Sequence, residues 1–586
     1  MQKSMVLAMV AALAAASCST GNQGILRADA QLAEVGDSST GEIAQAPGGP
    51  APVLPPTTGL AHDLFVTSPR CGQCHDSAAG ASANLDEKGR SVGLFSLWGA
   101  SAMGNSARDP LFRTALANEI ARAPAAAGAI ASVCLTCHSP MGRHAQIRAG
   151  HATSMNLVYA AGPESDLARD GISCAACHQI APTGLGQEAS FSGGYQLGTQ
   201  REIYGPYAAP FANPMKNMVG YTPMQGSHIQ DSALCGSCHA LVTEALTPEG
   251  KGTGHKMGEQ LTYLEWRRSA FTTEGGGTSP RSCQDCHMPD TQDDGQPLNT
   301  RLARRPNGTD FPPLQPRGPF SRHTFVGANT LLPKLLRQGR AQLNPQASDA
   351  ALSQAEQLAR DNLGKNAASL QVLAVSAAAG KVDFRVRVVN LAGHKFPSGY
   401  PSRRAFLHLE LIDAAGAVLW QSGQVDAQGR LMGANGQPLA AELLGGPYHP
   451  HRQQILAADE VLVYESVMDD GHGLPSFDLL GAEGFLKDNR LLPIGHHDET
   501  TGPLSTAPIG VSDSDFTPGV DEVAVHVVVS GKPAQIRATL RYQTFGPRYL
   551  AEMARRPTAE AAALQAMVKT GNLSPEQVAQ VVVAVP

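Results

Sequence analysis

The chain has 586 residues and a formal net charge of −6, with an isoelectric point near 6.3. It is too long for a single hydrophobic core, so we expect two folded units joined to tethers. Lysine and arginine are scattered rather than clustered, which gives no electrostatic basis for binding nucleic acid or an anionic membrane surface.

The first residues are typical of an export signal. Lys3 gives a short positive region, residues 5–16 are apolar, and Ala15-Ala16-Ser17 places small residues before Cys18. The pattern resembles a bacterial lipobox, so we expect a signal peptide over 1–18 and lipidation of Cys18; an ordinary cleaved signal peptide is the alternative. In lipoproteins generally, Ser19 after the cysteine favours the outer membrane. We expect a lipid-anchored protein of the periplasm or outer membrane of a Gram-negative bacterium, with the face of the membrane left open.

Residues 19–58 are rich in Gly, Pro, Ser and Ala and show neither helical nor strand periodicity. This composition predicts a flexible tether that would let an anchored domain move away from the membrane. Disorder without a function explains the composition equally well.

Ten of the eleven cysteines fall into five identical C-x-x-C-H motifs. The five motifs are Cys71-Cys74-His75, Cys134-Cys137-His138, Cys174-Cys177-His178, Cys235-Cys238-His239 and Cys283-Cys286-His287. In such a motif the two thiols can add to the vinyl groups of one haem while the histidine becomes the proximal iron ligand. The pattern predicts five covalently bound haem c groups in a domain over 59–340.

Structural zinc is the main competing interpretation, because paired C-x-x-C motifs also build tetrahedral zinc sites. A histidine follows the second cysteine every time, which zinc does not require, and a zinc interpretation would leave five histidines in excess. A disulfide framework is a second alternative, but cysteines three positions apart pair poorly with each other. The repeated histidine therefore favours haem.

Each haem iron also needs a sixth ligand or an open face. Candidate distal ligands before residue 340 are the histidines His62, His144, His151, His228, His255 and His323, with Met103, Met141 and Met288 as rivals. There are six such histidines for five irons, so full bis-histidine ligation is possible on count. A His/Met pair would raise the reduction potential relative to bis-histidine ligation.

Further phrases carry a resemblance to a known family. They are WGASAM at 98–103, ARDP at 107–110, GISC at 171–174, YGPY at 204–207, HIQDS at 228–232, EQLTYLEW at 259–266, CHMP at 286–289 and HTFVG at 323–327. With the five motifs, these phrases resemble the multihaem c-type cytochromes related to cytochrome c-554, in a long form with an added β domain. The resemblance implies electron transfer and singles out Met103, His228 and His323 as distal ligands, without pairing them with particular irons; His144 and His255 follow as weaker candidates.

The pattern changes after residue 340. Residues 347–367 predict a connecting helix within 341–369, and alternating apolar residues then predict strands near 382–388, 406–410, 417–420, 461–464, 523–527 and 536–540. We expect an antiparallel β-sandwich over 370–546, which contains no cysteine for a covalent haem, and a helical tail over 547–586. The tail should form two short helices, one over 558–570 and one that begins at Ser574, with Pro575 at its first position and Gln577 three residues after the cap. The fold class is thus multidomain: a loop-rich, mainly α pentahaem domain followed by an antiparallel β-sandwich and short C-terminal helices.

Two groups of polar residues in the second domain are of interest. The phrase GHKFPSG at 393–399 predicts contact with the haem domain, with His394 or Arg404 near a haem propionate, although an exposed turn is about as good an interpretation. The histidines His449, His451, His496 and His497 could bind a metal, but surface histidines in loops are commoner.

Three functions remain in competition. The favoured one is an electron relay between redox partners, with other redox proteins or a quinol-linked donor as partners and the lipid anchor as the one contact with the membrane. The second is a reductase or oxidase in which one open haem acts on a small nitrogen or sulfur oxyanion; the uniform histidine of the motifs lowers its weight. The third is a binding protein whose β-sandwich docks a mineral, a polysaccharide or a partner.

Overall fold

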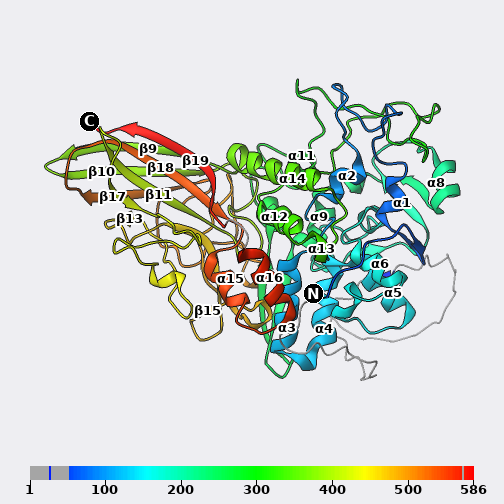
Figure 1. Ribbon diagram of the computed structural model, residues 1–586, viewed down its shortest axis with the longest axis horizontal. Helices are drawn as coiled ribbons and strands as arrows, with labels where there is room; N and C mark the ends of the chain where they lie inside the picture. The colour runs from blue at the N-terminus through cyan, green and yellow to red at the C-terminus, as the bar shows by residue number, and fades with distance from the viewer. Residues whose placement is uncertain (1–25, 28–51, 570–572) are drawn as a thin grey trace, which may run out of the picture.

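The computed structural model describes residues 26–27, 52–569 and 573–586. Figure 1 shows two parts side by side: short helices and loops from the first half of the chain, and a set of long strands from the second half. The signal peptide, Cys18 and most of the predicted tether lie outside the described residues. The structure is therefore multidomain, loop-rich and mixed helical and antiparallel, as the sequence predicts.

The first part, which we call the motif domain, consists of short helices. Their bounds are α1 Ser68–Gly72, α2 Leu94–Gly99, α3 Pro110–Arg122, α4 Ala127–His138, α5 Pro140–Ala149, α6 Pro163–Arg169, α7 Cys174–His178, α8 Ala212–Val219, α9 Ser232–His239, α10 Thr262–Arg267 and α11 Cys283–His287. Proline begins α3, α5 and α6, where its missing N–H costs no hydrogen bond.

The strands of the motif domain pair only two by two. The pairs are β1 Leu26–Arg27 with β4 Gln196–Leu197, β2 Ala61–His62 with β3 Phe65–Val66, β5 Glu202–Gly205 with β6 Thr222–Gln225, and β7 Leu241–Leu246 with β8 Gly252–Gln260. The β5–β6 pair is parallel and the others are antiparallel. No sheet of three or more strands forms in the described part of this domain.

The folded domain begins before the predicted boundary at residue 58. Leu54 is fully buried, and its carbonyl accepts a hydrogen bond from the Asn344 side chain at 2.6 Å. The buried Arg108 guanidinium donates to Thr57 Oγ1 at 2.7 Å. Proline and glycine punctuation had suggested a free tether here, but the backbone oxygens of this segment satisfy buried donors of the domain.

Three helices join the two parts: α12 Leu331–Gln338, α13 Arg340–Leu343 and α14 Asp349–Asn362. Ser348 caps α14 by accepting from the Ala351 N–H, and a π-helical turn over Leu363–Ala367 leads directly into the first strand of the second part. The connecting helix predicted over 347–367 is thus present as α14, which covers 349–362 and is followed by the π-helical turn.

The second part is a sandwich of two sheets, which we call the β domain. Its strands are β9 Ala368–Ala378, β10 Lys381–Asn390, β11 Arg404–Asp413, β12 Val418–Ser422, β13 Gln454–Ile455, β14 Val463–Asp469, β15 Pro475–Ser476, β16 Gly484–Asp488, β17 Val520–Val528, β18 Pro533–Gln543 and β19 Glu576–Ala584. One sheet has the order β13-β17-β10-β9; the other has the order β15-β14-β11-β18-β19, with β12 on β11 and β16 on β14.

Alternating side chains build the core between the sheets. On β10, Val382, Phe384, Val386 and Val388 are at most 2% exposed, while the residues between them face outward to varying degrees. Strand β11 differs because it is buried on both faces. Its leucines join the sandwich core, whereas Phe406 belongs to a second apolar cluster beneath the loops.

The end of the chain departs from prediction. Helices α15 Pro547–Met553 and α16 Ala559–Lys569 form, and α16 packs against α3 (Figure 1). The second predicted tail helix, signalled by Ser574, Pro575 and Gln577, is wrong: residues 576–584 form strand β19 antiparallel to β18. The β-branched run at 581–583 favours a strand, and pairing with the open edge of β18 outweighs the weak capping signal.

Among the described residues, no single helix has the length and apolarity to cross a membrane. One bent pair, Pro110–Arg122 with Pro124–His138, reaches that length and composition together, but across a 114° bend.

Candidate functional site

Each C-x-x-C-H motif lies on or beside a short helix. Motifs two to five occupy α4, α7, α9 and α11, and the first begins in α1 and continues as a turn in which the His75 N–H donates to the Cys71 carbonyl at 2.9 Å. Helical geometry places two cysteines three positions apart on the same face. Ser173 and Ser282 cap the helices of the third and fifth motifs, with a full capping box at Ser282.

The five motif histidines share one hydrogen-bond pattern. In each, Nδ1 faces an oxygen acceptor: His75 faces Leu302 O at 2.9 Å, His138 faces Ser106 O at 3.3 Å, His178 faces Tyr204 O at 2.6 Å, His239 faces Gln260 Oε1 at 2.9 Å and His287 faces Val326 O at 2.5 Å. Nδ1 must therefore carry the proton and donate it, which leaves the lone pair of Nε2 open. Metal-binding histidines in proteins are held in this way.

Burial favours the neutral imidazole at four of the motif histidines. Desolvation lowers the pKa of His138 to about 4 and lowers the pKa values of His75, His178 and His239. A neutral imidazole is the form that binds a metal. These four histidines are thus ready to ligate at neutral pH without losing a proton.

The ten motif cysteines are all free thiols, so the disulfide interpretation finds no bond among the described residues. Thiols of different motifs meet in pairs: Cys71 contacts Cys174, Cys137 contacts Cys238, and Cys235 contacts Cys283. The first motif therefore lies beside the third, the second beside the fourth, and the fourth beside the fifth. Each motif offers two thiols for attachment to a porphyrin and one imidazole nitrogen for its iron, the groups that a covalent haem requires.

Two of the phrases that carry the family resemblance meet at the third motif. The Trp98 indole N–H donates to the Ile172 carbonyl at 2.8 Å, and the Ile172 N–H donates to the Met103 carbonyl at 3.1 Å. Between them, Gly171 has φ +64°, and a Cβ there would come within 2.9 Å of Met103 O. A glycine is needed at this crossing because it tolerates both the left-handed backbone and the close approach.

Two pairs of imidazole rings lie parallel at the same unusual separation. The ring centroids of His178 and His323 are 6.2 Å apart with planes at 12°, and those of His287 and His394 are 6.3 Å apart with planes at 9°. Among the described residues these are the two imidazole pairs so arranged. Direct face-to-face contact would bring the rings to about 3.5–4 Å, so neither pair is a simple stack.

The second ring of each pair is also fixed through Nδ1. His323 donates to Ser321 O at 3.0 Å and His394 donates to Lys395 O at 2.9 Å, so the Nε2 atoms of both rings are open. His323 was singled out from the sequence. The sequence places His394 only near a haem propionate, because all five motifs lie before residue 340; the signal that points to it is the GHKFPSG phrase.

The other candidate distal ligands differ in their surroundings. His144 is 7% exposed, lies edge-on to Phe65, and its buried Nε2 has no hydrogen-bond partner. His228 is buried with Nε2 against the Ile180 carbonyl at 2.9 Å, so that Nδ1 is the nitrogen open to a metal. Met103 is half-buried, and His255 is exposed on β8, 3.7 Å from Glu483.

The four histidines of the β domain do not form one cluster. His449 pairs with Glu442 at 2.8 Å, His496 meets Thr506 at 3.1 Å, and His497 is exposed. Glu442 also pairs with Arg404 at 2.6 Å, so the Arg404 guanidinium is engaged inside the β domain and not directed to the motif domain.

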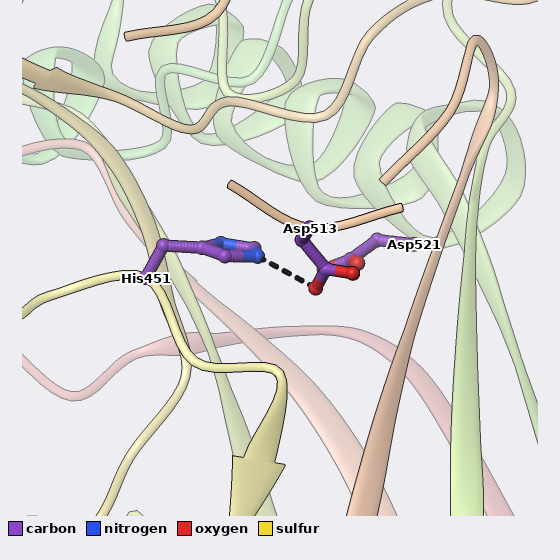
Figure 2. Close-up of side chains that lie close together, drawn as sticks. All are labelled: His451, Asp513 and Asp521. Carbon is purple, nitrogen blue, oxygen red and sulfur yellow. Dashed lines mark hydrogen bonds and ion pairs between the residues drawn. The ribbon is translucent and has the colours of Figure 1, made fainter. Parts of the chain in front are cut away.

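His451 instead approaches two carboxylates, as Figure 2 shows: Nε2 lies 3.1 Å from Asp513 Oδ2, and Asp521 completes a group of ligand atoms within 4.8 Å of one another. The Asn489 amide donates to His451 Nδ1 at 3.1 Å and to the Val463 carbonyl, which fixes the amide orientation. Nδ1 is therefore an acceptor and Nε2–H a donor to Asp513. This is the tautomer of a buried hydrogen-bond network and the opposite of the one found in the motif histidines.

Comparison with known proteins gives little. No family model matches the sequence, and no curated protein matches it. Among solved structures, the crystal structure of a penta-haem cytochrome c552 from Thermochromatium tepidum is similar, with a TM-score of 0.48 and 16% sequence identity over 90% of this chain and 100% of that chain.

Proposed function

We propose that this protein is a c-type cytochrome that binds five haems covalently through its C-x-x-C-H motifs and relays electrons between redox partners. The observation that carries the proposal is the shared state of the five motif histidines, each with Nδ1–H donated to an oxygen and Nε2 open. This tautomer is typical of metal-ligating imidazoles, and the histidine that follows every C-x-x-C pair, which zinc does not require, favours haem as the group they ligate. Bound haem would supply a one-electron Fe(III)/Fe(II) couple at each motif.

The pairing of His178 with His323 supports ligation from both sides of one iron. A metal–imidazole bond of about 2.0 Å and about 1.1 Å from the ring nitrogen to the centroid give a centroid separation of about 6.2 Å across a single metal atom. The observed separation is 6.2 Å. His144, with its unpaired buried Nε2, has the character of another distal ligand, because a buried polar atom without a partner is costly unless something else binds it.

The contacts between motifs support a continuous path for electrons. The first motif touches the third and the second touches the fourth, while the fourth also touches the fifth. The thiols of Cys177 and Cys238 lie close enough to interact electrostatically, which joins the third motif to the fourth. All five centres would thus belong to one connected set, the arrangement that a relay needs.

The proposal for the cellular surroundings of the relay rests on the sequence alone. We propose that the protein is exported, cleaved before Cys18 and lipid-anchored there, with other redox proteins or a quinol-linked donor as its partners. The absence of clustered lysine and arginine supports attachment through the lipid rather than through charge.

The test is made on the purified holoprotein. The intact mass should contain five haem additions and should show whether Cys18 is the modified first residue. The variant His323→Ala should keep five haems but convert one of them to a high-spin centre that binds carbon monoxide when reduced, because its iron loses one axial imidazole.

The matched control is His472→Ala, an exposed histidine in a turn of the β domain, which should leave every haem as in the wild type. A mass with fewer than five haems would contradict the proposal at its centre. An unchanged spectrum for His323→Ala would contradict the pairing with His178, and a wild-type haem that binds carbon monoxide would favour the reductase or oxidase alternative.

A further inference from the structure

We infer that the β domain supplies His394 as the second axial ligand of the iron held by His287, so that the fifth haem is ligated by both domains. This inference rests on the proposed function, since it needs a haem at the fifth motif. It assigns a ligand to a strand connection of a sandwich that carries no cysteine.

The geometry of the two rings is the first argument. Their centroids are 6.3 Å apart and their planes 9° apart, almost the same values as for His178 and His323. One metal atom between two imidazoles requires about 6.2 Å. Two separate pairs, one formed within the motif domain and one formed across the domain boundary, thus reach the same metal-bridging geometry.

The hydrogen bonds of the pair are the second argument. His287 donates from Nδ1 to Val326 O at 2.5 Å, and His394 donates from Nδ1 to Lys395 O at 2.9 Å. Both rings therefore have Nε2 as the open nitrogen. Because both rings donate from Nδ1, neither Nε2 offers a hydrogen to the other, and a metal atom between the rings can be bound by both.

The loop that carries His394 is held rigidly from its own domain. At the end of β10, the buried Asn390 side chain donates to the His394 carbonyl at 2.9 Å and to the Leu491 carbonyl at 3.0 Å, and it accepts from the Ala392 N–H at 2.8 Å. A ligand needs such support because its position must be fixed before the metal binds.

The same loop is fixed to the motif domain by buried charges. Glu265 on α10 is fully buried and accepts from the Lys395 N–H at 3.1 Å, one residue after the proposed ligand. Arg490 pairs with Glu265 at 2.9 Å and with Asp488 at 2.8 Å, and the Lys395 ammonium donates to Asp488 at 2.7 Å. These four charges, Glu265, Lys395, Asp488 and Arg490, form what we call the interface charge cluster.

Close backbone packing completes the contact. A Cβ on Gly393 would lie only 3.3 Å from Phe271 and 3.4 Å from Trp266, both of the motif domain. Further along the loop, a Cβ on Gly399 would lie 3.2 Å from Gln260 Oε1, the atom that accepts from His239. The loop thus reaches the surroundings of the fourth motif through Gly399 and those of the fifth through His394.

The experiment uses three single variants of the full-length holoprotein. His394→Ala should keep five haems by mass and convert one of the five from low-spin to high-spin, and added imidazole should restore the low-spin state. His394→Met should keep that haem low-spin but raise its reduction potential, because a thioether replaces an imidazole. His497→Ala, an exposed histidine of the same domain, should change neither property.

Mass, spin state and potential separate the possible failures. The inference would be overturned if His394→Ala kept five haems with unchanged spin states and His394→Met kept an unchanged set of reduction potentials. The proposed function would then still stand. A wild-type protein without five haems would overturn the proposed function instead. If His394→Ala does not fold, the potential of the methionine variant decides the question, because a residue with only a structural role would not shift the potential of one centre.

Discussion

The two domains achieve a packed interior in different ways. In the β domain, β10 alternates buried and outward residues, and one apolar cluster runs between the sheets. In the motif domain, helices of five to thirteen residues and two-stranded pairs surround a small cluster that includes Ala175 and Ala176 at a motif, and a larger cluster is shared with the connecting and C-terminal helices. Side chains alone build the first interior, whereas the second is arranged around positions that are held for a cofactor.

The two domains therefore depend to different degrees on contacts with the rest of the chain. The β domain has its own apolar cluster between the sheets, whereas the motif domain shares its largest apolar cluster with helices α12, α15 and α16. The interface charge cluster is where the two meet, so it is the first place to test whether the domains are energetically separate.

The largest effect is expected for Glu265→Ala. The substitution leaves Arg490 and Lys395 buried with an excess of positive charge, which typically costs about 3–5 kcal/mol when one partner of a buried ion pair is removed. We expect one cooperative loss of that size in the free energy of unfolding, measured by chemical denaturation of the holoprotein. Glu249→Ala, in an exposed turn of the motif domain, is the control and should cost almost nothing. A change confined to the unfolding of one domain would show that the domains are independent.

An intermediate effect is expected from Asp521 in the β domain alone. Burial raises the pKa of this carboxyl to about 7, above its value in the unfolded chain. The contribution of protonated Asp521 to the free energy of unfolding is therefore fully present below about pH 4 and is lost as the pH rises through 7.

Asp521→Asn should remove this loss, so that the variant gains on the order of 3 kcal/mol relative to the wild type between pH 4 and pH 8. The measurement is the free energy of unfolding across that range. Tyr464 can still donate to the amide oxygen as it does to Asp521 at 2.7 Å. Glu499→Gln, an exposed carboxyl in the same domain, should leave the profile unchanged, and equal profiles for Asp521→Asn and wild type would refute the buried-proton explanation.

The smallest effect tests the closing strand β19. Val578 is 2% exposed and belongs to the sandwich core, whereas Val582 on the same strand is 48% exposed. Val578→Ala should destabilise the protein by about 2 kcal/mol, and Val582→Ala should change the free energy of unfolding by less than about 0.5 kcal/mol. Equal effects of the two substitutions would mean that β19 does not pack on the core as described.

Local sequence patterns predicted the parts of this molecule that depend on local chemistry. The five motifs, the alternating strands of the sandwich and the connecting helix can all be read within a few residues. His323 was singled out through its family phrase, and its ring does lie parallel to that of His178. The assignment of distal ligands to particular irons stays a prediction.

What the sequence missed depends on contacts between distant residues. The GHKFPSG phrase predicts contact of its loop with the motif domain, but no local pattern shows that the ring of His394 lies parallel to that of His287, because this depends on how the β domain docks on α10. Residues 576–584 form a strand because β18 offers an open edge, and Leu54 is ordered because Asn344 binds its carbonyl. In each case a partner elsewhere in the chain decides the structure, which periodicity and capping rules do not include.

The interface charge cluster also limits how this protein can have been assembled from parts. Two acidic and two basic side chains balance one another there, with Glu265 contributed by one domain and Lys395, Asp488 and Arg490 by the other. If either domain were transplanted to another chain, it would carry an unbalanced charge in a surface that is buried in this protein. The two halves are therefore not interchangeable modules, and a partner domain taken from a relative must bring the matching charge with it.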